Sequence, residues 1–164
     1  MEDNMHEALK PISWLAGRWS TKQGHGKYPT MKDFNYHDTL EFICIGQPMF
    51  NVTTTSVHPE KQVPMHQERG FLRIKPGTNH IALITSHNFG VTSIEEGDVD
   101  VEKNEITLKS TSIARISFAK PPAVTNTMKV IKLLTTDTIE VISFMETEDT
   151  PLTEHLRAIY NKEV

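Results

Sequence analysis

The chain contains one cysteine among its 164 residues, and this scarcity excludes several kinds of protein. Cys44 has no second cysteine in the chain to pair with, and iron–sulfur clusters or thiolate zinc fingers need several cysteines. Nor does any stretch approach the roughly 20 consecutive apolar residues of a membrane-spanning helix. We therefore expect neither thiol-based metal chemistry nor a helical membrane anchor.

Concentrated charge of one sign is lacking as well. The chain has 17 basic and 21 acidic residues, a formal net charge of −4, and its basic residues are scattered along the sequence. Nucleic-acid-binding surfaces usually cluster Lys and Arg, so no nucleic-acid partner is expected. Residues 1–10 lack the apolar segment of a secretory signal, which predicts a cytoplasmic protein with no membrane partner.

Helix signals are scarce beyond residues 6–15, where apolar residues recur at helical spacing around Pro11. After a first strand, Gly24 and Gly26 indicate a turn or an irregular stretch. The remaining chain alternates apolar and polar residues or is rich in β-branched residues, both typical of strands. The expected strands are 17–21, 34–45, 48–57, 66–74, 80–86, 91–96, 105–118, 126–134, 139–145 and 154–160.

These roughly ten strands are separated by short turns, which favours antiparallel pairing because parallel neighbours need long crossovers. Closing such a sheet removes its exposed edges and leaves room for one small ligand. Blurred alternation in 105–118 predicts a β-bulge. The last segment also fits a helical stripe, but a barrel needs a final strand to pair with the first. The sequence thus predicts one all-β domain over residues 1–164, an antiparallel barrel with a short N-terminal helix.

His155 is the main candidate for a functional residue, because a terminal strand can carry one imidazole into an otherwise apolar cavity. A lone histidine is, however, more often a hydrogen-bonded or surface residue than a ligand. Glu95 and Glu96 are expected to be solvated charges. Six histidines show no metal-ligand spacing and are expected on the surface or in turns: His6, His25, His37, His58, His80 and His87.

The chain resembles the calycins, the barrel architecture of lipocalins and fatty-acid-binding proteins, and more specifically the nitrobindins. Nitrobindins are haem-binding β-barrels that also occur as the C-terminal domain of an animal THAP-type zinc-finger protein. The matching motifs span nearly the whole chain in the family's order, and they are residues 14–19, 28–30, 64–66, 70–73, 95–97, 113–120, 151–152 and 155–156. One departure is that Thr21 and Gln23 replace two glycines of the family's G-x-W-x-G-x-G opening.

This resemblance implies one b-type haem per chain, with His155 as the proximal ligand of the iron. It places Thr30 along the haem site and Met65, His66 and Met145 near the pocket. The implied activity is binding of NO at the iron and isomerisation of peroxynitrite to nitrate by the ferric form, so the partners are small molecules. No general acid or base is obvious from the sequence, and His66 is the one candidate for that role. A homodimer remains open.

Two other functions are compatible with such a barrel. One is a haem-free carrier of a fatty acid or another apolar molecule, whose carboxylate Arg73 and Arg115 would bind from inside. The other is an interaction module with a filled barrel. Uptake of hemin separates the haem-binding function from the other two, and binding of an apolar fluorescent probe separates the carrier from the interaction module.

Overall fold

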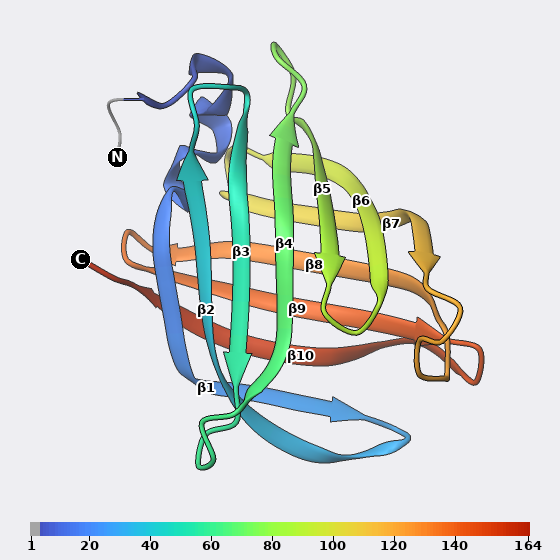
Figure 1. The fold of residues 1–164 in the computed structure, drawn as a ribbon. Helices are drawn as coiled ribbons and strands as arrows, with labels where there is room; N and C mark the ends of the chain where they lie inside the picture. Colours follow the sequence, from blue (N-terminus) through green and yellow to red (C-terminus); the bar gives the residue numbers. More distant parts are fainter. Residues whose placement is uncertain (1–3) are drawn as a thin grey trace.

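Ten antiparallel strands form a closed barrel in the computed structural model, which describes residues 4–164 (Figure 1). A short 3-10 helix, η2 (Glu7–Leu15), precedes them. The strands are β1 (Gly17–Tyr28), β2 (Met31–Cys44), β3 (Met49–Val57), β4 (Pro64–Ile74), β5 (His80–His87), β6 (Val91–Asp100), β7 (Glu105–Arg115), β8 (Val124–Thr135), β9 (Thr138–Thr147) and β10 (Thr150–Lys162).

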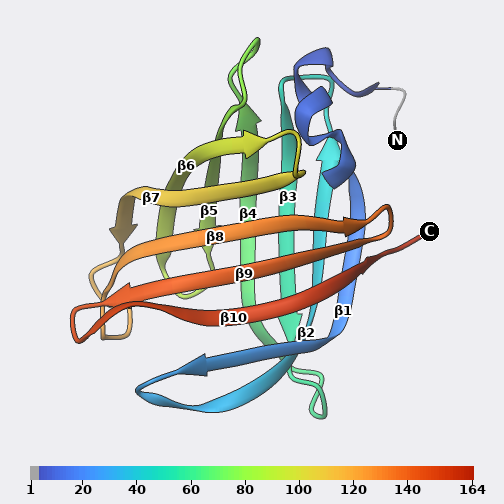
Figure 2. The same cartoon turned by 180° about the vertical axis from the view of Figure 1, so that it is seen from behind.

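Each strand pairs with its neighbour in the chain, and pairing of β1 with β10 closes the sheet (Figure 2). The predicted all-β barrel of about ten strands is therefore confirmed, including the final strand that also fitted a helical stripe. Residues 1–3 of the predicted domain, and of the segment screened for a signal, lie outside the described residues. Within residues 4–164, no helix is long and apolar enough to cross a membrane.

The expectation of a turn or irregular stretch at Gly24 and Gly26 is wrong, because β1 continues through both glycines to Tyr28. A Cβ at Gly24 would lie 2.4 Å from the ring of Tyr36, and a Cβ at Gly26 would lie 2.2 Å from the ring of Phe34. The glycines thus let two aromatic rings of β2 lie directly on the backbone of β1. Their function is close packing within a strand.

The predicted bulge is present in β7. Ile94 pairs with Ser112 whereas Glu95 pairs with Ser110, so Thr111 has no partner in β6. The strand then ends at Arg115, three residues earlier than predicted. Ile116 instead begins a turn that is held by a hydrogen bond from the Ala119 amide to the Ile116 carbonyl.

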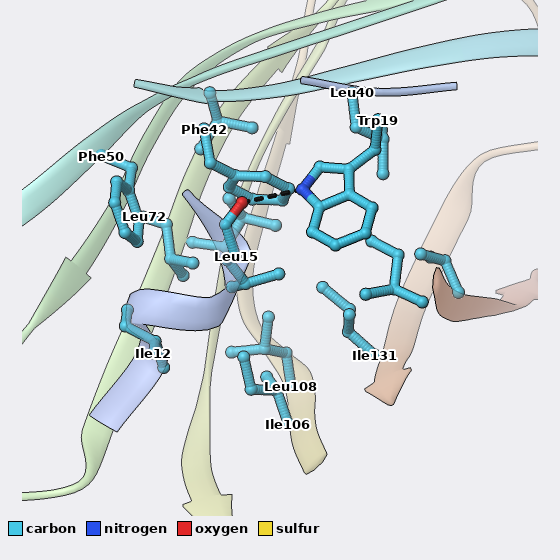
Figure 3. Close-up of a cluster of buried hydrophobic side chains, with 14 of the residues drawn as sticks. Ile12, Leu15, Trp19, Leu40, Phe42, Phe50, Leu72, Ile106, Leu108 and Ile131 are labelled. Carbon is cyan, nitrogen blue, oxygen red and sulfur yellow. Dashed lines mark hydrogen bonds between the residues drawn. The ribbon is translucent and has the colours of Figure 1, made fainter. Parts of the chain in front are cut away.

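Apolar side chains fill the end of the barrel beneath η2. Leu9, Ile12 and Leu15 of η2 are fully buried in the same cluster as Trp19 of β1. The Trp19 indole donates a hydrogen bond of 2.8 Å to the carbonyl of Leu15, which fixes the helix to the barrel (Figure 3). The ammonium of Lys162 lies 5.2 Å from the centroid of the Trp19 ring. This end of the barrel is closed to ligands.

Candidate functional site

The opposite half of the barrel contains two adjoining cavities of about 170 and 150 Å³. Strand β9 shows the change along the barrel, because Ile139 belongs to the apolar core whereas Met145 lines a cavity. Because alternate residues of a strand share a face, Ser143 points to the same interior as these two residues. Six residues line both cavities: His66, Glu68, Lys129, Ser143, His155 and Leu156.

His155 lies on β10, half-buried on the wall of both cavities. Its Nδ1–H donates a hydrogen bond of 3.0 Å to the carbonyl oxygen of Lys27 on the adjacent strand β1. The rings of Tyr28 and Phe34 contact the imidazole edge-on, with centroids 5.3 and 6.0 Å away. These contacts hold the ring in place and leave Nε2 as an unprotonated nitrogen donor.

The charge state of His155 follows from its surroundings. Burial lowers the pKa of the imidazole, and the hydrogen bond to the Lys27 carbonyl opposes this effect only in part. The net direction is downward from the ordinary value, so the ring is neutral at pH 7. A neutral imidazole is the form that binds a metal ion.

The other four predicted site residues lie in two groups. Met65 and His66 of β4 line the first cavity together with His155, and His66 also lines the second. Met145 lines the second cavity and an outer cavity of about 170 Å³. Thr30 lines only this outer cavity, exposed in the turn between β1 and β2. Met65, His66 and Met145 therefore each line a cavity that His155 also lines, whereas Thr30 does not.

The expectation of an otherwise apolar cavity is wrong. Glu68 of β4 and Lys129 of β8 line both cavities, with 3.9 Å between Lys129 Nζ and Glu68 Oε2. Burial raises the pKa of Glu68, but the charge of Lys129 and a hydrogen bond from His87 outweigh it and hold the pKa well below its usual range. Burial also lowers the pKa of Lys129, and Glu68, Glu95 and Asp38 raise it above its ordinary value. Both side chains are ionised at pH 7.

A second polar group lies deeper in the first cavity. Tyr160 of β10 donates a hydrogen bond of 2.6 Å to Oδ2 of Asp38 on β2. Burial is the main cause that raises the pKa of Asp38 to about 7, and the Tyr160 hydrogen bond opposes it. Among the described residues, Oδ1 of Asp38 is buried without a hydrogen-bond partner. Asp38 thus titrates near neutral pH inside the barrel.

Two sequence expectations about charged residues need correction. His87, expected on the surface or in a turn, has a side chain only 12% exposed and lines the second cavity. Glu95, expected to be solvated, is buried and accepts a hydrogen bond of 3.0 Å from Thr127. Its neighbour Glu96 points outward and pairs with His80, as alternation along β6 requires.

The two arginines considered for a carrier function lie outside the barrel. Arg73 is exposed, with its guanidinium near the Met49 sulfur, and Arg115 is exposed with a hydrogen bond to the Ala119 carbonyl. The internal cation is Lys129, which Glu68 already neutralises. The interior therefore lacks the arginines on which that alternative depended.

The alternation of residues along the strands could have identified part of the polar site from the sequence. His66 and Glu68 are two residues apart in one strand, so they must share a face. Lys129 likewise shares a face with Ile131 and Leu133, which pack in or against the core. The approach of His87 to Glu68 depends on the register between β4 and β5, which the sequence does not specify.

Comparisons with known proteins agree with this architecture. A family model described as "THAP4-like, heme-binding beta-barrel domain" matches residues 8–162. The human peroxynitrite isomerase THAP4 is 40% identical over 159 residues, which cover 96% of this chain and 27% of that protein. The chain thus spans about a quarter of the length of this relative. A peroxynitrite isomerase of Nocardia farcinica (strain IFM 10152) is 34% identical over 162 residues, covering 97% of this chain and 93% of the relative.

A solved structure shows the same fold. The crystal structure of Rv2717c from M. tuberculosis superposes with a TM-score of 0.88 and 28% sequence identity. The superposition covers 98% of this chain and 99% of the other. The barrel, its strand order and nearly its full length are therefore shared with that protein.

Proposed function

The chain belongs to the family of THAP4-like, haem-binding β-barrel domains, and on this basis we propose that it binds haem and isomerises peroxynitrite to nitrate. The proposal comprises one b-type haem per chain, with His155 as the iron ligand, carried by a single domain. It includes binding of NO at the same iron. Relatives named peroxynitrite isomerase support the reaction, and the cavity residues of this chain support the ligand.

The observation that carries this proposal is the arrangement around His155. Its Nδ1–H is engaged by the Lys27 carbonyl, so Nε2 is the nitrogen available to iron. Histidines that bind metals usually donate their other ring N–H to such an acceptor, which fixes the tautomer and makes the free nitrogen more basic. The residue is also neutral at pH 7 and lines two cavities.

The cavity walls fit a haem group in part through apolar contacts. Leu156 and Met65 line the first cavity and Met145 lines the second, while the rings of Phe34 and Tyr28 hold the His155 imidazole. Glu68 and Lys129 balance each other's charge, so the polar part of the wall carries little net charge. The residues present therefore suit a large, mostly apolar group bound through one nitrogen.

The residues of the chain bind and position, and none is assigned proton transfer. Ferric haem, when bound, supplies an electrophilic centre for the peroxo oxygen of peroxynitrite. His155 would hold the iron through Nε2, and Leu156 and Met145 would pack against the group. Because isomerisation of peroxynitrite to nitrate needs no net gain or loss of protons, the lack of an assigned acid or base is consistent with this chemistry.

Hemin titration of the purified apoprotein tests the proposal. We expect saturable uptake of one hemin per chain with a Soret band, and faster peroxynitrite decay with nitrate as the main product. His155→Ala should shift the Soret band and abolish the acceleration, because apolar contacts alone would then hold the group. His80→Ala is the matched control, since this histidine is exposed and pairs with Glu96 and Asp98. Equal spectra and rates for His155→Ala and the wild type would contradict the proposal.

A further inference from the structure

Three side chains in the second cavity direct potential metal ligands toward one point. His66 and Glu68 project from β4, and His87 projects from the end of β5, where it pairs in register with Glu68. Glu68 Oε1 lies 3.0 Å from His87 Nδ1 and 3.3 Å from His66 Nε2, and the two nitrogens are 3.0 Å apart. The Glu68 and His87 side chains are only 9% and 12% exposed.

These separations match those around a small transition-metal ion. Zn²⁺ binds imidazole nitrogen and carboxylate oxygen at about 2.0–2.2 Å, which places neighbouring ligand atoms about 2.8–3.6 Å apart, with the lower values at octahedral angles and the higher values at tetrahedral angles. All three edges of the triangle formed by the His66, Glu68 and His87 donor atoms fall in this range. The separations of the three donor atoms therefore allow one ion to contact all of them.

The surrounding residues hold the two imidazoles in this orientation. Nε2 of His87 lies 3.0 Å from the hydroxyl of Ser93 and 3.3 Å from that of Thr85, both of which are buried. If Nε2–H donates to these hydroxyls, Nδ1 presents its lone pair to the centre of the triangle. The ring of Phe89 contacts both His66 and His87, with centroids 5.1 and 5.3 Å away. Such outer contacts are typical of metal-binding histidines.

One of the two carboxylate oxygens of Glu68 is available to an ion. Lys129 approaches Oε2 of Glu68, whereas both histidines approach Oε1. Without a cation, two nitrogens and a carboxylate oxygen lie at hydrogen-bonding distance from one another, so at least one of the two imidazoles must carry a proton between them. A divalent ion would replace that proton and satisfy all three atoms.

We propose that His66, Glu68 and His87 form a metal site, separate from His155, which binds one divalent transition-metal ion such as Zn²⁺ or Fe²⁺. Two imidazoles and one carboxylate favour these ions over Ca²⁺ and Mg²⁺, which prefer oxygen ligands. All three residues line the same cavity of about 150 Å³, which His155 also lines. The site needs no haem.

Zinc titration of the untagged chain, stripped with a chelator, tests this site. Calorimetry should show one Zn²⁺ per chain, and Co²⁺ should give visible absorption bands that Zn²⁺ removes. Loss of an outer-shell partner alone usually costs about 10–100-fold in metal affinity, so His87→Ala and Glu68→Gln should each weaken binding at least tenfold. Ser93→Ala is a milder variant that leaves all three ligands, and about tenfold weaker binding is expected.

Two controls separate this site from surface histidines and from the haem proposal. His80→Ala removes a β5 histidine that faces two carboxylates on the surface, and it should bind Zn²⁺ as the wild type does. His155→Ala, which lacks the proposed iron ligand, should also retain Zn²⁺ binding. Circular dichroism verifies that each variant is folded. Failure of the wild type to bind Zn²⁺ at micromolar concentration, or equal affinity in His87→Ala, Ser93→Ala and His80→Ala, would overturn the proposal.

Discussion

Tyr160 and Asp38 are joined by a hydrogen bond of 2.6 Å, although 122 positions separate them in the chain. They project from β10 and β2, the two strands that flank β1 where the barrel closes. This bond therefore ties the last strand to the second strand across the interior. It also leaves a carboxyl group buried in the cavity wall, with a pKa raised to about 7 mainly by burial.

The stability of the protein should depend on the ionisation of Asp38. Its pKa rises from 3.8 to about 7 on folding, so the native state keeps a proton that the unfolded chain loses in this interval. The contribution of this carboxyl group to the free energy of unfolding is therefore greatest below pH 4. It falls by at most about 1.4 kcal/mol per pH unit as the pH rises to about 7, and it is constant above that pH. The negative charge of Glu68 favours the protonated form of Asp38, and the positive charge of Lys129 favours its ionised form.

Urea unfolding between pH 5 and pH 8 measures this effect against Asp38→Asn. The amide still accepts the Tyr160 hydrogen bond but does not ionise, so the variant should gain stability relative to the wild type as the pH rises. Asp137→Asn, at an exposed carboxylate, is the control and should show no such trend. Parallel pH profiles for the wild type and Asp38→Asn would disprove the buried titration.

Gly26→Ala should displace an aromatic ring next to His155. The added Cβ would meet the Phe34 ring at 2.2 Å, and that ring contacts the His155 imidazole. Overpacking of this kind usually costs about 1–3 kcal/mol, and we expect a loss of hemin affinity with it. Thermal unfolding and hemin titration measure the two effects, with the exposed Lys22→Ala in the same strand as control. Wild-type behaviour of Gly26→Ala would show that the ring moves freely.

Trp19→Phe should destabilise the barrel more than Trp14→Phe. The Trp19 indole is fully buried and donates to the Leu15 carbonyl, whereas the buried indole nitrogen of Trp14 has no hydrogen-bond partner among the described residues. Removing the Trp19 donor leaves a buried carbonyl unsatisfied, which costs about 1–3 kcal/mol, while Trp14→Phe removes an unpaired group. Denaturant unfolding compares the two. A larger loss for Trp14→Phe would contradict the role of the Trp19 bond.

The Glu68–Lys129 pair should behave as a coupled buried ion pair. Lys129→Met leaves the Glu68 carboxylate without its cation, and breaking such a pair typically costs about 3 kcal/mol or more. Adding Glu68→Gln to this variant removes the stranded charge and should restore part of the loss. A double-mutant cycle by denaturant unfolding gives the coupling. Additive losses would mean that the two charges do not interact.

Regular alternation of apolar and polar residues made the strands predictable. Features that depend on contacts between strands could not be predicted in this way. Alternation and turn residues predicted roughly ten strands and a bulge within residues 105–118, because both depend on local sequence. The continuation of β1 through Gly24 and Gly26 was missed, since it depends on rings contributed by β2. The motif-based resemblance supplied His155.

The charged interior of the site was missed for a related physical reason. Hydropathy places Glu68 and Lys129 outside, and only their proximity across the barrel makes their burial acceptable. His87 was missed because its neighbours in β4 follow from strand register. Local sequence patterns thus predicted the strands of the barrel wall. The polar residues inside the barrel could be identified only from the pairing of strands in the closed sheet.

Resonance Raman spectroscopy of the hemin-loaded, reduced protein tests most directly whether His155 binds the iron. The arrangement of Lys27, His155 and the cavities predicts an iron–histidine stretching band in the wild type. The band should be absent from His155→Gly and should return when free imidazole fills the space left by the side chain. An unchanged band in His155→Gly without imidazole would contradict the account, because another residue would then hold the iron.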